Sequence, residues 1–137
     1  MIIETSNTIL AQLRTIDGPK TIDDWGGEID DLISQVAKLP AIFLLYSGAQ
    51  FAPKQGIGSN RASHTDNWTV VVIDKNLRSK DAAAVDCYEL IEQVRSKLIG
   101  FDSGNGYLWP VSEALIHSEK GKMVYGLEYL TDTETED

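Results

Sequence analysis

Hydrophobic residues in the first part of the chain recur with the period of an α-helix. One helical face carries four of them, Ile9, Leu10, Leu13 and Ile16. Ile2 lies one heptad before Ile9 and extends the same stripe. The pattern predicts an amphipathic helix over about residues 3–16, ended by the Asp17-Gly18-Pro19 turn.

A second helical stripe follows a polar connection. Its apolar positions are Ile29, Leu32, Ile33 and Val36. Glu28, Asp30 and Asp31 lie in the first turn, where carboxylates interact favourably with the helix dipole. Pro40 cannot continue a helix, so we expect the second helix to end before it.

Two apolar runs in the middle of the chain have the composition of β-strands. Residues 41–46 are continuously apolar and stop before Gly48, which predicts a buried strand. Residues 68–73 are rich in β-branched side chains and predict a second strand. Residues 48–66, between them, are polar and contain glycine. We expect a long loop there, of the kind that often carries function.

The remainder of the chain predicts one helix and two strands. An apolar stripe over residues 84–98, followed by Gly100 at a C-cap position, predicts the helix. Residues 111–116 and 123–130 predict two strands around a turn. Residues 131–137 alternate threonine with acids, which indicates either a strand extension or an acidic tail.

The order of these elements favours one fold class. Strands come in consecutive pairs, which favours antiparallel neighbours over parallel crossovers. We therefore predict an α+β fold with a mostly antiparallel sheet of about four strands and helices packed on one face. A single domain is expected over residues 1–130.

The charge of the chain narrows its possible partners. Its 137 residues carry a formal net charge of −9, which argues against coating nucleic acid or docking on anionic lipid. No stretch reaches the ~20 apolar residues that span a bilayer. The N-terminal segment has no signal-peptide pattern, so we expect the protein to stay in the cell that makes it.

No catalytic or metal-binding constellation stands out. Cys87 lies on the apolar stripe of a predicted helix, which favours core packing over a nucleophile. His64 and His117 lack metal-ligand spacing. We predict no enzyme, no cofactor and no metal site. The alternative from a different class is a small hydrolase or nucleotide-binding enzyme that uses Asp102, Ser103 or His64.

Two segments instead carry residue types that are enriched at protein interfaces. The predicted loop contributes Phe51, Lys54 and Arg61. The glycine-containing turn before residue 110 adds Tyr107 and Trp109, whose rings could equally close one end of the core. We predict that these five residues contact another subunit or another protein.

Unlike charges are separated along the chain. Residues 54–80 carry a net charge of +3, whereas residues 23–31 and 128–137 each hold five acids and no base. Separated charges allow copies of one chain to pair, and a randomly mixed surface is the alternative. The candidate cations are Arg78 and Lys80. Their candidate partners on another copy are the acids Asp23, Asp24 and Glu134.

Several blocks of sequence occur together in one order. They are IDDL at 29–32, LPAIFLLY at 39–46, NRASH at 60–64, WTV at 68–70, NLRS at 76–79, LIGFD at 98–102 and WPVSE at 109–113. Over about residues 2–130 the chain thereby resembles a family of proteins from Mu-like phages and prophages. Members of that family look like tail terminators, similar in fold to the terminator of lambda-like phages.

The resemblance implies a structural role. A terminator forms a ring, expected to have six subunits, that caps the tail tube and presents the surface to which the head attaches. The implied partners are further copies of the chain, the tail tube and head–neck proteins, without sequence-specific nucleic-acid binding. The implied location is the virion tail, after assembly in the host cytoplasm. Another neck or tail-completion protein of the same virion is the alternative.

Overall fold

The structure is a computed structural model of the whole chain. It describes residues 2–36, 38–53, 61–75, 80–119 and 121–136, with the backbone alone at 61, 80–86, 119 and 132–136. The elements in chain order are α1 (Ile2–Leu13), β1 (Thr21–Asp24), α2 (Ile29–Gln35), β2 (Ala41–Phe51), β3 (Arg61–Lys75), α3 (Lys80–Leu98), β4 (Trp109–Glu119) and β5 (Lys122–Glu136).

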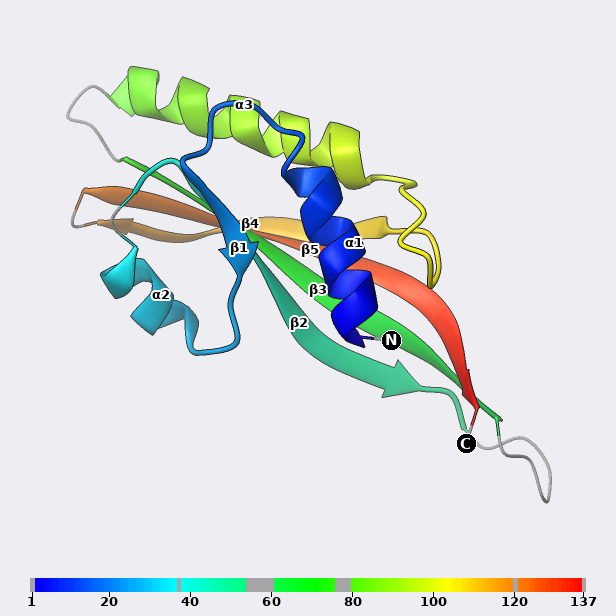
Figure 1. Cartoon of the computed structure of the whole chain (residues 1–137). Coiled ribbons are helices and arrows are strands. Elements are labelled where there is room, and N and C mark those ends of the chain that lie inside the picture. The colour runs from blue at the N-terminus through cyan, green and yellow to red at the C-terminus, as the bar shows by residue number, and fades with distance from the viewer. Residues whose placement is uncertain (1, 37, 54–60, 76–79, 120, 137) are drawn as a thin grey trace.

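Within the described residues, five strands form one sheet in the order β1-β2-β3-β5-β4 (Figure 1). The β1–β2 pair is parallel, and the other three pairs are antiparallel. Strand β3 lies at the centre and pairs with β5 along its whole length, from Arg61 opposite Glu136 to Lys75 opposite Lys122. Strands β1 and β4 are therefore the two edges of the sheet.

One face of the sheet is covered by α1 and α3. Alternate residues of β3, Trp68, Val70 and Val72, are buried there against the two helices. The apolar stripes of the helices meet them: Ile9, Leu10 and Leu13 from α1, and Cys87, Leu90, Ile91, Val94 and Leu98 from α3. Burial of a large aliphatic side chain stabilises a fold by about 1.5–3 kcal/mol, so this layer dominates the core.

The opposite face is covered in part by α2. Val71 and Ile73 of β3 point to this side and are buried with Leu32 and Ile33 of α2. Figure 1 shows α2 below the sheet and α3 above it. Because neighbouring residues of a strand point to opposite faces, the continuous apolar runs of β2 and β3 require cover on both sides.

The predicted fold class is confirmed: the chain is α+β with a mostly antiparallel sheet. Two details differ from the prediction. The sheet has five strands because Thr21–Asp24, expected to be a polar connection, pairs with β2. The helices lie on both faces because the second predicted helix packs on the opposite side from the other two.

The predicted loop over residues 48–66 is wrong at both ends, and residues 54–60 within it lie outside the described residues. Strand β2 continues to Phe51, and β3 begins at Arg61. The hydrophobic pattern did not indicate these strand ends because their side chains are mostly polar. They are strands because their backbone groups form hydrogen bonds with the neighbouring strands. Phe51 is opposite His64, and the register continues to Gly48 opposite Asn67.

These strand ends form a three-stranded ribbon, which we call the arm. It consists of residues 47–51 of β2, 61–67 of β3 and 130–136 of β5. Strand β5 runs on to Glu136, so residues 131–136 extend the strand, beyond the last pair between β4 and β5 at Trp109 and Leu130. In Figure 1 the arm extends away from the helices.

A buried polar cluster joins the arm to the body. The Tyr46 hydroxyl donates a hydrogen bond to Oδ1 of Asp66 at 2.9 Å. His64 Nε2 lies 3.3 Å from the same oxygen, and Asp66 is only 3% exposed. Burial and the contact with Asp66 raise the pKa of Tyr46 to about 12. The contacts of Tyr46 and His64 with the buried Asp66 carboxylate therefore position these side chains where the arm begins.

The first helix also differs from its prediction at both ends. It ends at Leu13, and Ile16 is buried although it lies beyond the helix. Ile2 does not join the buried stripe, because it is 47% exposed, and Ile3 is 74% exposed. The N-terminal turn of α1 thus presents two large apolar side chains to solvent.

The alternation of faces along β2 can be tested with two neighbouring leucines. Leu44 is 1% exposed beneath α1 and α3, whereas Leu45 is only partly buried on the opposite face. We expect Leu44→Ala to lower the free energy of unfolding by about 2–5 kcal/mol, and Leu45→Ala to lower it by clearly less. Urea unfolding at equilibrium measures both, and equal losses would contradict this assignment of faces.

Two tyrosine hydroxyls provide a second test. Tyr46→Phe removes the hydrogen bond to Asp66, so we expect a loss of about 1–3 kcal/mol in the free energy of unfolding at pH 7. The matched control is Tyr129→Phe. The Tyr129 hydroxyl is buried and has no hydrogen-bond partner among the described residues, so its removal should change stability little.

The Tyr129→Phe variant should also differ from the wild type in how its stability depends on pH above about 10. Burial raises the pKa of Tyr129 to about 12, so the folded state holds the phenol proton more tightly than the unfolded state. The contribution of the protonated Tyr129 to folding stability is fully present below about pH 10, the usual tyrosine pKa. This contribution is lost as the pH rises through about 12, the pKa in the folded state. Tyr129→Phe should therefore lose less stability than the wild type over this interval. An identical pH dependence of the two proteins would argue against a buried, protonated Tyr129.

Candidate assembly surfaces

The tip of the arm presents one of the predicted contact residues. Phe51 is 63% exposed, and its ring stacks on His64 with the ring centroids 4.9 Å apart. His64 thus lies in a strand beside Asp66, not in a polar loop as predicted. The other two contact residues predicted in this segment are not tested: Lys54 is outside the described residues, and Arg61 is described only by its backbone at the start of β3.

The turn before β4 presents the other predicted aromatic residues. Tyr107 is 68% exposed and Trp109 is 60% exposed, while Leu108 between them is fully buried. Leu108 N–H donates to the Phe101 carbonyl at 2.9 Å, and Gly100 N–H donates to the Leu108 carbonyl at 2.8 Å. These bonds anchor the buried residue, so period-two alternation directs both aromatic rings outward. Neither ring closes the end of the core.

Strand β4 carries further exposed apolar residues. Val111 and Ile116 are 53% and 44% exposed, and the Ile116 side chain lies over Gly126. Leu115 is 51% exposed but is opposite Tyr125, so it faces the same side of the sheet as α3, whereas Trp109, opposite Leu130, and Ile116 face the other side. We call Tyr107, Trp109, Val111 and Ile116 the β4 ridge.

An ion pair links β4 to α3. The Arg95 guanidinium of α3 donates to both oxygens of the Glu113 carboxylate of β4, with Nε 2.9 Å from Oε2 and 3.2 Å from Oε1. Hydrogen bonding to Glu113 raises the pKa of Arg95 above its ordinary value. The Arg95 side chain is about half exposed, so the pair contributes modestly to stability.

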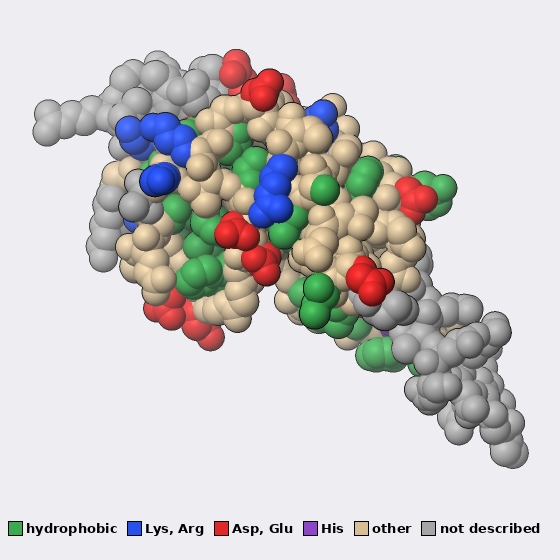
Figure 2. All heavy atoms as spheres, viewed as in Figure 1, with side chains coloured by type: hydrophobic (Ala, Val, Ile, Leu, Met, Phe, Trp, Pro, Cys, Tyr) green, Lys and Arg blue, Asp and Glu red, His purple; other side chains and the backbone are tan. Residues whose placement is uncertain are grey.

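A groove lies on the other side of the molecule, at the edge formed by β1. It has a volume of about 230 Å³. Most of its lining is formed by Ile2, Ile3, Trp25, Leu44 and Tyr46. The rest of the lining is formed by Ser6, Asn7, Asp24 and Gly26. We call it the α1 groove. Figure 2 shows hydrophobic side chains at the surface near the N-terminal end of α1.

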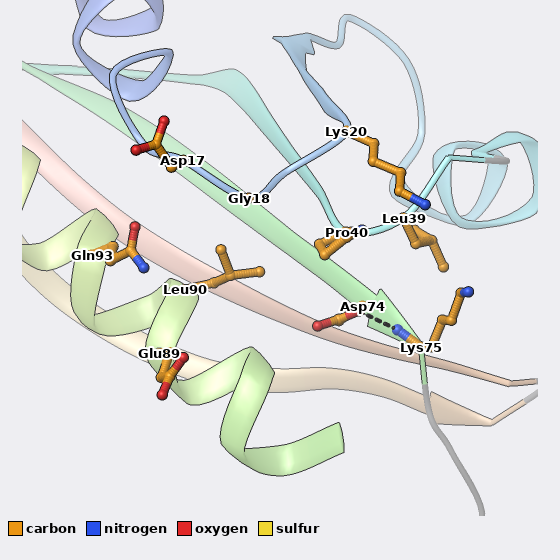
Figure 3. Close-up of a pocket in the computed structure, with 10 residues that line it drawn as sticks. All are labelled: Asp17, Gly18, Lys20, Leu39, Pro40, Asp74, Lys75, Glu89, Leu90 and Gln93. Atoms are coloured by element: carbon orange, nitrogen blue, oxygen red, sulfur yellow. Dashed lines mark hydrogen bonds between the residues drawn. The ribbon is translucent and has the colours of Figure 1, made fainter. Parts of the chain in front are cut away.

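A larger pocket of about 350 Å³ lies where α3 faces the ends of β2 and β3 (Figure 3). Lys20 and Lys75 lie on one side of it, and Asp17 and Glu89 on the other. Asp74 also lines the pocket, and its Oδ1 accepts a hydrogen bond from the Lys75 backbone N–H at 2.7 Å. The lining contains no cysteine, histidine or serine, so it holds no Ser–His or Cys–His pair.

The candidate reactive residues Cys87, Ser103 and Asp102 are buried in the core or hydrogen-bonded within a turn. Cys87 is fully buried, which raises the pKa of its thiol to about 12 and leaves it uncharged at neutral pH. The Ser103 hydroxyl donates to the Gly106 carbonyl at 2.7 Å, and Asp102 Oδ1 accepts from Gly104 N–H at 2.9 Å. Within the described part of the chain, no group of three or more His, Cys, Asp or Glu side chains could hold a metal ion.

The predicted charge pairs between copies fall largely outside the described residues. Arg78 is not described, and Lys80 is described only by its backbone at the start of α3. Of the acids proposed as partners, Asp23 lies 3.6 Å from Arg14 within the same chain. None of the helices in the described segments is long and apolar enough to cross a membrane.

Comparison with known proteins places the chain in a family. In the solved virion of a native gene transfer agent particle, one chain has the same fold, with a TM-score of 0.62 and 15% sequence identity. The similarity covers 95% of this chain and 94% of the other. No curated protein sequence gives a significant match. Residues 1–118 match the family model of bacteriophage Mu Gp37, and the chain belongs to that family.

Proposed function

We propose that this protein is a non-enzymatic structural component of a phage or prophage tail, and specifically a tail terminator. In this proposal, six copies form a ring that caps the tail tube and provides the surface for head attachment. The observation that carries the proposal is the combination of membership in a bacteriophage Mu family with a fold shared, over nearly the whole of both chains, with a component of a virion.

The distribution of exposed apolar side chains supports an assembly role. The β4 ridge and the α1 groove are apolar surfaces at opposite edges of one sheet. Contacts between unlike surfaces of identical chains are head-to-tail and close into a ring when the rotation between copies permits. Large exposed apolar surfaces are uncommon on proteins that act as monomers.

The arm supplies a contact for the tube in this proposal. Phe51, exposed at its tip, is an aromatic anchor of the kind that dominates interface energies. Lys54 and Arg61 follow it in sequence, and pairing of Arg78 and Lys80 with acids of a neighbouring copy stays a prediction. A net charge of −9 suits a ring through which DNA passes without being gripped.

A second candidate is another neck or tail-completion protein of the same virion. The two roles differ in the surface to which the protein docks. Co-sedimentation with isolated tail tubes and with isolated heads separates them, because a terminator binds the end of a tube before any head is present.

We expect the purified protein to form a discrete oligomer. Six copies of a 15.1 kDa chain give a ring of about 91 kDa. Size exclusion with light scattering, at several concentrations and with the tube protein added, measures this mass. Negative-stain images should show rings, and tubes polymerised in the presence of the protein should be shorter than tubes polymerised alone.

Absence of any effect on tube length would contradict the terminator proposal. Strong DNA binding at physiological salt would separately contradict the idea of a ring lumen that does not grip DNA.

A further inference from the structure

We infer that the arm binds an extended segment of another virion protein, which adds to the sheet as a strand along the outer edge of β5. The segment pairs with the backbone of residues 132–136 and carries lysine or arginine at alternate positions. The inference deepens the proposed function by naming the chemistry of a partner, and it rests on that function only for the partner's place in the virion.

The end of β5 is a regular strand with a neighbour on one side. From Thr131 to Glu136 every residue of β5 has a partner in β3, and the register runs without a shift. Strand β4, on the other side of β5, makes its last pair at Leu130. Alternate N–H and C=O groups of residues 132–136 therefore point away from β3, and no described strand pairs with them. In Figure 1 this part of β5 (red) lies in the arm, beyond the helices.

The other exposed edges of the sheet are protected against added strands. Strand β4 has two shifts in register. The outer edge of β2 in the arm follows a shift between Tyr46 and Gly48, where Gly48 has a φ of 115°. Strand β1 has only four residues, and Arg14 Nε donates to its Ile22 carbonyl at 3.3 Å. Short strands, bulges and covering side chains are common ways to block an edge.

The edge of β5 in the arm lacks these features. Residues 131–136 contain neither proline nor glycine, and their pairing with β3 has no bulge. This edge is distinguished only by charge. Residues 132, 134 and 136 are acids, and as alternate residues of one strand they belong to the same face of the sheet. Charge of one sign opposes pairing with a strand of the same sign, but not with one of the opposite sign.

The charge pattern identifies the occupant as a basic strand. Two copies that met edge to edge would place acids opposite acids, which is destabilising. A strand with lysine or arginine at alternate positions forms cross-strand pairs of opposite charge, while its backbone satisfies the open edge. Asp132 and Glu134 are opposite Thr65 and Ser63 in β3, so neither has a basic residue across from it on that side.

Three capped peptides of about eight residues, a usual strand length, test the inference on the full chain. The first alternates lysine with threonine. The second has glutamate in place of lysine. The third is the lysine peptide with its backbone nitrogens methylated, so it keeps its charge but cannot donate backbone hydrogen bonds.

The lysine peptide should slow amide hydrogen exchange at every second residue of 132–136, by roughly tenfold or more at saturation. Only alternate residues respond, because strand addition engages the outward N–H groups and leaves the bonds to β3 unchanged. The glutamate peptide and the methylated peptide should leave the exchange rates unchanged. NMR resolves the exchange of each residue.

Reversal of two charges on the edge provides the matched variant. Asp132→Lys combined with Glu134→Lys should weaken binding of the lysine peptide by roughly tenfold or more and favour the glutamate peptide. Both residues lie in the arm, beyond the helices that cover the core, so the variant should fold. Asp17→Lys combined with Glu89→Lys adds the same charge at exposed positions outside the arm and should bind like the wild type.

Several outcomes would overturn the inference. They are no slowing with the lysine peptide, slowing that maps to the β4 ridge or the α1 groove, and equal binding of the methylated peptide. Exchange at residues 132–136 that is already slow in the free protein, and slower at higher protein concentration, would identify a second copy as the occupant and also overturn it.

The peptide measurements require neither rings nor tail tubes, so they are independent of the test of the proposed function. Protein that shortens tubes but does not bind the lysine peptide contradicts this inference alone. Protein that binds the lysine peptide along β5 but does not shorten tubes supports the inference and contradicts the terminator role.

Discussion

The rest of the structure depends on the pairing of β3 with both of its neighbours. Val71 and Val72 are adjacent in this strand and fully buried on opposite faces, so β3 belongs to both core clusters at once. A shift of its register by one residue would exchange these faces. The positions of α2 on one side, and of α1 and α3 on the other, follow from this one strand.

The pairing of β3 with β2 and β5 extends beyond the helices into the arm, where the interactions that stabilise the strand are different. In the body, β3 is stabilised by burial of its side chains, whereas in the arm it is stabilised by hydrogen bonds to β2 and β5. Tyr46, Asp66 and His64 mark the transition, where a buried carboxylate is satisfied by two polar partners. The arm can thus carry polar side chains outward without losing the sheet.

Edge strands are usually protected, because their unpaired backbone and apolar side chains favour association. Strand β4 has shifts in register at Pro110/Ser112 and Leu115/His117, which disturb simple strand addition along its edge. Its apolar side chains nevertheless remain exposed. This combination suits side-chain contacts with a defined neighbour better than open-ended sheet formation.

The sequence by itself determined the elements with strong periodicity. The apolar stripes of α1 and α3, the β-branched run of β3 and the core position of Cys87 are local properties, because spacing within one element decides which side chains face inward. Only the tertiary structure decided three other features. Strand β1 has a single apolar residue, Ile22, and exists because β2 offers it a partner. The arm consists mainly of polar residues that are ordered by long-range strand pairing. Ile3 and Trp109 are exposed because no neighbouring element of the described chain covers them. Hydrophobic periodicity within one element does not show whether another element covers a given side chain.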